Sequence, residues 1–140
     1  MMRRSSRCSL AALGALAVAG PLTLAACDAW TLDYGEPAAQ FEARDAAALA
    51  GDYLGQKVTV RGEVLAVDTS DPQNCVLQLQ HGVSARFGAF RTMAEHYKVG
   101  EVIYVDGIID AVVAGETTSC VVLDPAIGRD PTASFEPERP

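Results

Sequence analysis

The chain has 140 residues, of which 11 are basic and 18 acidic, giving a net charge of −7 at pH 7. This length allows one compact domain with tails. The acidic excess counts against general binding of phosphate backbones. The negative charge is explained more simply by a surface that keeps the protein soluble than by a partner that this charge would bind.

The first residues have the order of a secretory signal. Basic residues precede an apolar stretch over residues 10–20, and small residues stand directly before Cys27. The stretch is shorter than the roughly 20 residues of a spanning helix, which favours a cleaved signal peptide over residues 1–26. A retained transmembrane helix is the weaker alternative. The pair Arg3 and Arg4 lacks the apolar residues that follow a twin-arginine motif, so general secretion is expected.

The stretch Leu24-Ala25-Ala26-Cys27 resembles the lipobox of bacterial lipoproteins, in which the cysteine is acylated and the chain is cut before it. This resemblance implies that Cys27 anchors the chain in a bacterial membrane of the cell envelope, facing the periplasm or another extracytoplasmic space. The alternative is ordinary secretion with a free Cys27. Asp28 resembles an inner-membrane retention signal of some Gram-negative groups, a rule that varies, so both membranes stay open.

Two cysteines remain after the signal and the anchor are set aside. Cys75 and Cys120 then lie in an oxidising compartment, where one disulfide between them is expected. The bridge would close a loop of about 45 residues and contribute roughly 4 kcal/mol. The alternative is two buried free thiols, because both cysteines lie within strand-like patterns.

A tether and a helix come next in the chain. Residues 27–37 mix glycine, proline and aspartate with aromatic residues, as expected for a tether between membrane and domain. Residues 38–53 are rich in alanine and contain no proline, which predicts one amphipathic helix stopped by Gly55. The side chains expected on its buried stripe are Phe41, Ala48, Leu49 and Tyr53.

The rest of the chain has strand patterns. Residues 58–64 alternate between valine and mainly polar residues, the period of a half-buried strand. Residues 75–80 and 83–87 alternate in the same way around a turn at His81 and Gly82, which predicts a hairpin.

A short helical segment and two more strands complete the predicted elements. The strands are expected at about residues 102–112 and 118–123. Residues 128–140 combine prolines with charges and are expected to form a disordered tail. The helical segment has apolar residues at helical spacing, namely Phe90, Met93 and Tyr97.

Two stretches of the chain repeat one pattern. Residues 54–67 align without gaps on residues 99–112, and both place a glycine within alternating Val and Ile, at Gly62 and Gly107. A glycine inside a strand marks a bulge or a sharp coil. We therefore expect two long strands that bend there and serve both sides of a small barrel.

The motifs Tyr53-Leu54-Gly55-Gln56-Lys57, Val58-x-Val60-x-Gly62-x-Val64, Val99-Gly100-Glu101, Ile103-x-Val105-x-Gly107 and Val121-x-Leu123 carry a family resemblance. Over residues 38–127 the chain resembles small OB-fold bacterial lipoproteins, the tRNA anticodon-binding-domain-like group. The expected fold is mainly β with a preceding α-helix, a five-stranded Greek-key OB barrel with a short helix between strands three and four. These motifs specify a fold and carry no chemistry.

An OB barrel usually binds its ligand on the face of strands two and three, between the loop after strand one and the loop after strand four. These loops would be residues 68–74 and 115–117. The side chains expected to face a ligand are Gln78, Gln80, Ser84 and Arg86.

Other site chemistries find less support in the sequence. His81 and His96 lack metal-ligand spacing with each other and with the cysteines, so no metal and no cofactor are expected. Acidic side chains at Glu63, Asp106 and Asp110 suit solvated strands, and no catalytic residue is expected. The strands also lack the basic and aromatic residues that line single-strand nucleic-acid sites.

These observations predict a function without catalysis. The chain is expected to be a membrane-anchored OB-fold module that binds a protein or a small polar ligand, with no nucleic acid as partner. The alternative is an oligonucleotide- or tRNA-binding OB domain. Removal of the signal leaves 8 basic and 18 acidic residues, a net charge of −10, which favours the first hypothesis.

Overall fold

The structure, a computed structural model, describes residues 36–113 and 119–140. The predicted signal peptide, Cys27, most of the tether and the loop residues 115–117 lie outside these ranges. Within the described ranges, no helix has both the length and the apolar character needed to cross a membrane.

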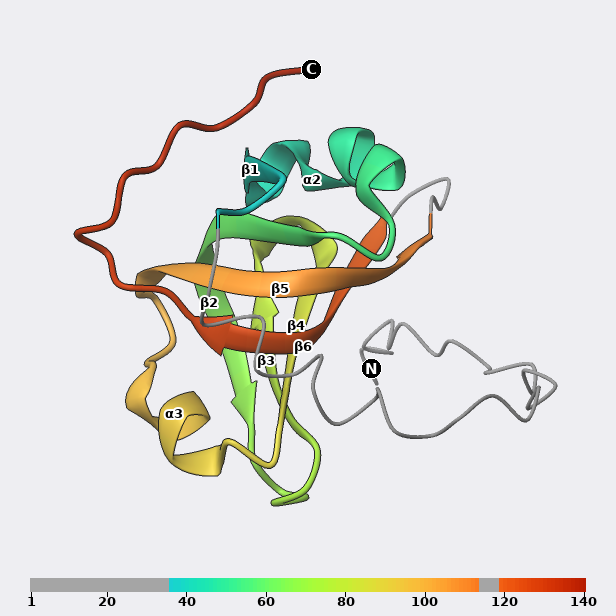
Figure 1. Cartoon of the computed structure of the whole chain (residues 1–140). Coiled ribbons are helices and arrows are strands. Elements are labelled where there is room, and N and C mark those ends of the chain that lie inside the picture. The colour runs from blue at the N-terminus through green and yellow to red at the C-terminus, as the bar shows by residue number, and fades with distance from the viewer. Residues whose placement is uncertain (1–35, 114–118) are drawn as a thin grey trace, which may run out of the picture.

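Five strands close into a small barrel (Figure 1). Around the barrel the strand order is β2-β3-β4-β6-β5, and β5 pairs again with β2. The β4 and β6 pair is parallel and the other barrel pairs are antiparallel. This is the OB-fold order, so the predicted fold is confirmed. The strands are β2 (Lys57–Asp68), β3 (Cys75–Leu79), β4 (Val83–Gly88), β5 (Val102–Val113) and β6 (Cys120–Gly128).

The long strands β2 and β5 each pair with two other strands of the barrel, as the repeated pattern predicts. β2 pairs with β5 through residues 57–63 and with β3 through residues 64–68. The pairing of β5 with β6 shifts register between Gly107 and Ile109, so a bulge lies at the predicted glycine. Gly62 has another role, because the register shift of β2 comes later, between Val64 and Ala66.

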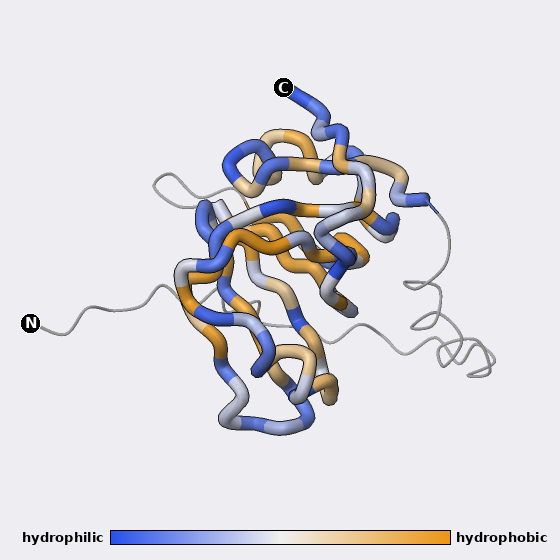
Figure 2. The backbone as a smooth tube through the Cα atoms, turned by 90° about the vertical axis from the view of Figure 1, so that its left-hand side faces the viewer, coloured by the Kyte–Doolittle hydropathy of each residue, from blue (hydrophilic) through white to orange (hydrophobic). Residues whose placement is uncertain are grey.

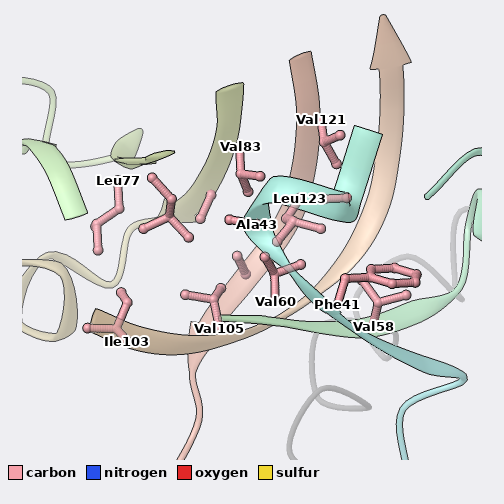
Figure 3. Packing of buried hydrophobic residues seen from close by; sticks show 14 of the residues in the cluster. Phe41, Ala43, Val58, Val60, Leu77, Val83, Ile103, Val105, Val121 and Leu123 are labelled. Carbon is pink, nitrogen blue, oxygen red and sulfur yellow. The ribbon is translucent and has the colours of Figure 1, made fainter. Parts of the chain in front are cut away.

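Aliphatic side chains fill the barrel (Figure 3). Apolar segments run through its strands, and polar segments dominate the loop below them in Figure 2. Each of the larger side chains contributes roughly 1.5–3 kcal/mol when fully buried. The predicted hairpin is confirmed: all of its alternate apolar side chains point inward, namely Cys75, Leu77, Leu79, Val83, Ala85 and Phe87.

Short helices cover the two ends of the barrel (Figure 1). One end is covered by α2 (Ala43–Leu49), which continues into the 3-10 helix η2 (Ala50–Tyr53). The other end carries α3 (Arg91–His96), between β4 and β5 as predicted. In α3, Ala94 is the buried residue, whereas the apolar side chains of Phe90 and Met93 are 52% and 37% exposed.

The predicted helix over residues 38–53 begins too early. Its first residues form β1 (Ala39–Glu42), which pairs in parallel with residues 58–61 of β2. Tertiary pairing therefore overrides the helix propensity of this segment. The buried stripe also differs, because Ala48 is exposed and Leu49 half-buried. Phe41 is buried but lies in β1, and the buried residues of the two helices are small ones, Ala43, Ala46 and Ala50.

The predicted disulfide between Cys75 and Cys120 is wrong, because Cys75 is a buried free thiol. Cys75 pairs with Gly88 at one end of β4, whereas Val121, the neighbour of Cys120, pairs with Val83 at the other end. Five extended residues separate these ends by about 16 Å. A disulfide needs Cα atoms within roughly 7 Å.

The segment predicted to be a disordered tail takes a defined course. β6 continues to Gly128, and the backbone N–H of Arg129 donates to the carbonyl of Tyr104 (2.8 Å). The chain then returns to the α2 end of the barrel (Figure 1), where the N–H of Glu138 donates to the carbonyl of Gln40 (2.8 Å). Composition indicates no such long-range contacts.

Candidate functional site

Three of the predicted ligand-facing residues lie together on the outer face of β3 and β4. Gln78 pairs with Ser84 across the two strands, and the amide Nε2 of Gln78 donates to Ser84 Oγ (3.2 Å). Ser84 is only 7% exposed, whereas Gln78 is exposed. Arg86 forms an ion pair with Asp124 on the neighbouring β6 (3.5 Å). This face therefore offers Gln78 to a ligand, and its other polar groups are already paired.

The fourth predicted residue, Gln80, lies apart from that face. It begins the 3-10 turn η3 (Gln80–Gly82) between β3 and β4, and its Nε2 donates to Glu63 Oε2 on β2 (2.8 Å). Gln80 and Glu63 both line a surface hollow that the other three predicted residues do not reach.

This hollow, which we call the Gly62 groove, has a volume of about 350 Å³. It lies where the start of α2, the middle of β2 and the turn η3 meet. A Cβ atom at Gly62 would stand 2.8 Å from the Cβ of Ala43, so glycine is what lets α2 approach the barrel here. Its lining residues are Glu42, Ala43, Arg44, Arg61, Gly62, Glu63, Gln80, His81 and Val102.

The groove carries both signs of charge. Arg61 binds Glu42 with two nitrogens, Nε to Oε2 at 3.1 Å and Nη2 to Oε1. The hydrogen bond to Glu42 raises the pKa of Arg61 above its usual value, so the guanidinium stays charged. Glu63 and the largely exposed Arg44 add one further acid and one further base. The groove can therefore both donate hydrogen bonds to a ligand and accept them.

His81 stands at the edge of this groove in an unusual backbone conformation. Among the described residues it is the one non-glycine residue with positive φ, at 63°. The hairpin requires this, because His81 and Gly82 turn the chain from β3 into β4. The sequence predicts this turn correctly. Residues other than glycine in such conformations often occur at functional sites.

Replacing His81 by glycine tests the backbone strain. Glycine adopts a positive φ without a Cβ clash, so we expect His81→Gly to raise the free energy of unfolding by up to about 1 kcal/mol. Glu95→Gly within α3 is the control and should lower it by roughly 0.5–1 kcal/mol. Urea unfolding followed by circular dichroism measures both. A clear loss for His81→Gly would mean that the imidazole makes stabilising contacts.

The loop after β2, expected to frame the ligand face, satisfies its own polar groups. The carboxylate of Asp68 accepts from the Ser70 N–H (3.0 Å), and that of Asp71 accepts from the Gln73 N–H (3.0 Å) and from Asn74 Nδ2 (2.8 Å). The bonds from Asn74 and Gln73 lower the pKa of Asp71. The loop thus has fewer free groups for a ligand than its composition indicates.

Asp124 gives the β4 and β6 face a dependence on pH. Burial raises the pKa of its carboxyl above the usual value, and Arg86 opposes this effect. With a raised folded-state pKa, the contribution of this group to stability is present at acid pH and is lost as pH rises through that pKa.

We therefore expect Asp124→Asn to be neutral at pH 3 and slightly stabilising at pH 7. The effect is small because the side chain is 42% exposed and screened by solvent. Urea midpoints at the two pH values measure it. A lower midpoint at pH 7 would show that the ion pair with Arg86 outweighs the cost of burial.

Within residues 36–113 and 119–140, no group of three His, Cys, Asp or Glu side chains is arranged to hold a metal ion.

Asp106, which the sequence presents as a solvated acid, is instead 5% exposed and bonded to Thr59 and Arg129. Sequence reasoning also missed Glu42 and Arg61 as groove residues. A usable signal was Gly62 between Arg61 and Glu63, a small residue flanked by opposite charges.

No family model and no curated protein matches the chain. Among solved structures it is similar to a lipoprotein from Klebsiella pneumoniae named as nucleic acid-binding, at 16% identity and a TM-score of 0.40 over 63% of this chain and 79% of the other. It is also similar to an aspartyl-tRNA synthetase from Leishmania major, at 10% identity and a TM-score of 0.45. That match covers 68% of this chain and 21% of the synthetase, so the chain spans about a fifth of that protein.

These matches correct one expectation. The names of both proteins refer to nucleic acid or to tRNA, which conflicts with our expectation that nucleic acid is not a partner. That expectation, drawn from net charge and from the lack of basic and aromatic residues on the strands, is withdrawn. Neither likeness identifies a ligand for this chain.

Proposed function

We propose that the chain is a lipid-anchored protein of a bacterial cell envelope whose OB barrel binds a small polar ligand in the Gly62 groove. The groove itself carries the proposal, because it gathers charged and polar side chains from three separate elements around a glycine. Its volume of about 350 Å³ falls within the range of small-molecule sites.

The charges of the groove define the ligand class. Arg61 and Glu42 neutralise each other, and Glu63 is held by the neutral amide of Gln80. A ligand that both donates and accepts hydrogen bonds, such as a saccharide or a short zwitterionic peptide, fits this balance better than a polyanion does. The proposal assigns binding to the groove and no catalysis.

Binding is tested by calorimetric titration of the purified mature protein with three probes: triacetylchitotriose, glycylglycine and the oligonucleotide (dT)12. We expect saturable binding of the saccharide or the dipeptide, weakened at least roughly tenfold in Glu63→Gln because one groove acceptor is lost. Lys98→Ala, an exposed change outside the groove lining, is the control and should bind as the parent does.

The oligonucleotide distinguishes the alternative. Binding of (dT)12 alone, unchanged in Glu63→Gln and lost in Arg86→Ala, would move the site to the β3 and β4 face. It would also replace the proposed ligand by nucleic acid. If none of the three probes binds, the groove lacks its assigned function and the proposal is contradicted.

The membrane anchor is tested separately by the intact mass of the membrane-extracted protein. We expect the parent chain to begin at an acylated Cys27, and a Cys27→Ala variant to lack the acyl mass. An unacylated, full-length parent chain would contradict the anchor and leave the groove proposal standing.

A further inference from the structure

Among the described residues, β1 pairs within the sheet with β2, and its other edge forms one isolated parallel bridge, between Phe41 and Glu138. The chain's own residues 134–138, which we call the strap, lie along this edge. The Glu138 N–H donates to the Gln40 carbonyl (2.8 Å), and the Glu136 N–H donates to the side-chain oxygen of Gln40 (2.5 Å). The amide of Gln40 donates in turn to the Ser134 carbonyl (3.4 Å). The strap is thus bound through its own backbone groups, as a peptide is bound in strand addition.

Side chains add specificity to these backbone contacts. The ring of Phe135 packs edge-on against Tyr104, with centroids 5.2 Å apart. Phe135 has a second contact, with Arg61, whose guanidinium lies 4.9 Å from the centroid of the Phe135 ring. The hydroxyl of Tyr53 donates to the carboxylate of Glu138, at 3.0 and 3.2 Å. The site therefore recognises an aromatic residue followed three positions later by an acid.

The strap is separable from the barrel. Arg129 is fixed by the buried carboxylate of Asp106 (3.2 Å), and a turn follows in which the Ala133 N–H donates to the Asp130 carbonyl (3.1 Å). Beyond this turn the strap residues are exposed or half-buried. Segments with few buried apolar contacts open at low cost. The strap can thus leave its site while the barrel stays closed.

We propose that this site also binds the strap of a second copy, so that two chains exchange residues 134–138 and form a symmetric dimer. Every copy carries the residues 134–138 that fill this site, which is the basis for choosing this occupant. Exchange of an identical segment replaces each contact by the same contact between chains. Tethering in one membrane would raise the local concentration that drives the exchange.

Two complementary variants test the exchange. Phe135→Ala keeps the site and weakens the strap, whereas Tyr104→Leu keeps the strap and weakens the site. Both are made in mature chains carrying Cys27→Ser, so that no acyl chain brings the copies together. We expect a mixture of the two to form 1:1 dimers in sedimentation analysis at a concentration roughly tenfold below that needed by either variant alone.

The control mixture pairs Tyr104→Leu with Phe90→Ala, a change to an exposed ring on another element. The Phe90→Ala copies keep their own straps in intact sites, so no free site is offered to the Tyr104→Leu strap, and the mixture should show no such gain. A mixture of the two test variants that stays monomeric at millimolar concentration would overturn the proposal. A synthetic peptide of residues 132–140 that binds Phe135→Ala while that mixture stays monomeric would show that the site accepts a separate segment without exchange between copies, and would also overturn it. None of these readouts depends on the ligand of the Gly62 groove.

Discussion

Replacing Asp106 by alanine is expected to lower the free energy of unfolding by about 3–5 kcal/mol. This is the usual cost of leaving one member of a buried charged pair without its partner. The carboxylate is 5% exposed and accepts from Thr59 Oγ1 (2.5 Å) and from Arg129 Nη1 (3.2 Å). Lys57 Nζ lies 3.8 Å away. Arg129 Nε is buried and has no hydrogen-bond partner among the described residues, so Asp106 is the main compensation for that guanidinium.

Urea unfolding monitored by circular dichroism measures this loss. The matched control is Asp110→Ala on the same strand, where the side chain is exposed, and its effect should stay within about 0.5 kcal/mol. A loss below roughly 1 kcal/mol for Asp106→Ala would mean that water reaches Arg129 and that the cluster is not a buried charge site.

Replacing Gly107 by alanine is expected to cost roughly 2–3 kcal/mol, because the new methyl group has no space. An added Cβ would stand 2.8 Å from the Cβ of Leu123, 3.2 Å from the Pro125 carbonyl oxygen and 3.3 Å from the Cβ of Ala126. All of these atoms belong to β6, which must shift away from β5 to make room. Because Gly107 lies at the register shift of this pair, the barrel would open there.

The control for this prediction is Gly51→Ala, in the 3-10 helix before β2. No atom lies within 4 Å of a Cβ added there, so the change should be neutral or stabilising by up to about 1 kcal/mol. The same unfolding measurement serves both variants. Equal midpoints for Gly107→Ala and the parent would show that β5 and β6 are loosely paired at the bulge.

Local patterns predicted the barrel because they reflect side-chain geometry along one strand. Alternation in residues 75–79 and 83–87 reports which side chains face the core, and every inward position of this hairpin is buried. The repeated glycine pattern likewise reports where a long strand must accommodate close neighbours. Gly107 meets β6 at a bulge, and Gly62 meets α2, so one sequence signal arose from two different contacts.

Contacts between distant segments explain the failures. Residues 39–42 have helical composition but become a strand, because β2 offers them a partner. The proline-containing end of the chain has the composition of a disordered tail, yet Arg129 and Phe135 find partners on β2 and β5. The predicted disulfide between Cys75 and Cys120 is wrong because it, too, depends on how distant segments are arranged. Alternation places both side chains toward the core, and only the register of β4 shows that they lie at opposite ends.

The sequence by itself determined the order of strands, the hairpin turn at His81 and Gly82, and the resemblance to a lipoprotein signal, since each depends on neighbouring residues. Only the tertiary structure assembled the Gly62 groove. Glu42, Arg61, Glu63 and Gln80 come from three parts of the chain and meet because β1 and α2 fold onto β2 beside the turn of the hairpin. Apart from Gly62 between Arg61 and Glu63, the sequence carries no signal of this meeting, because barrel closure sets the distances between these residues.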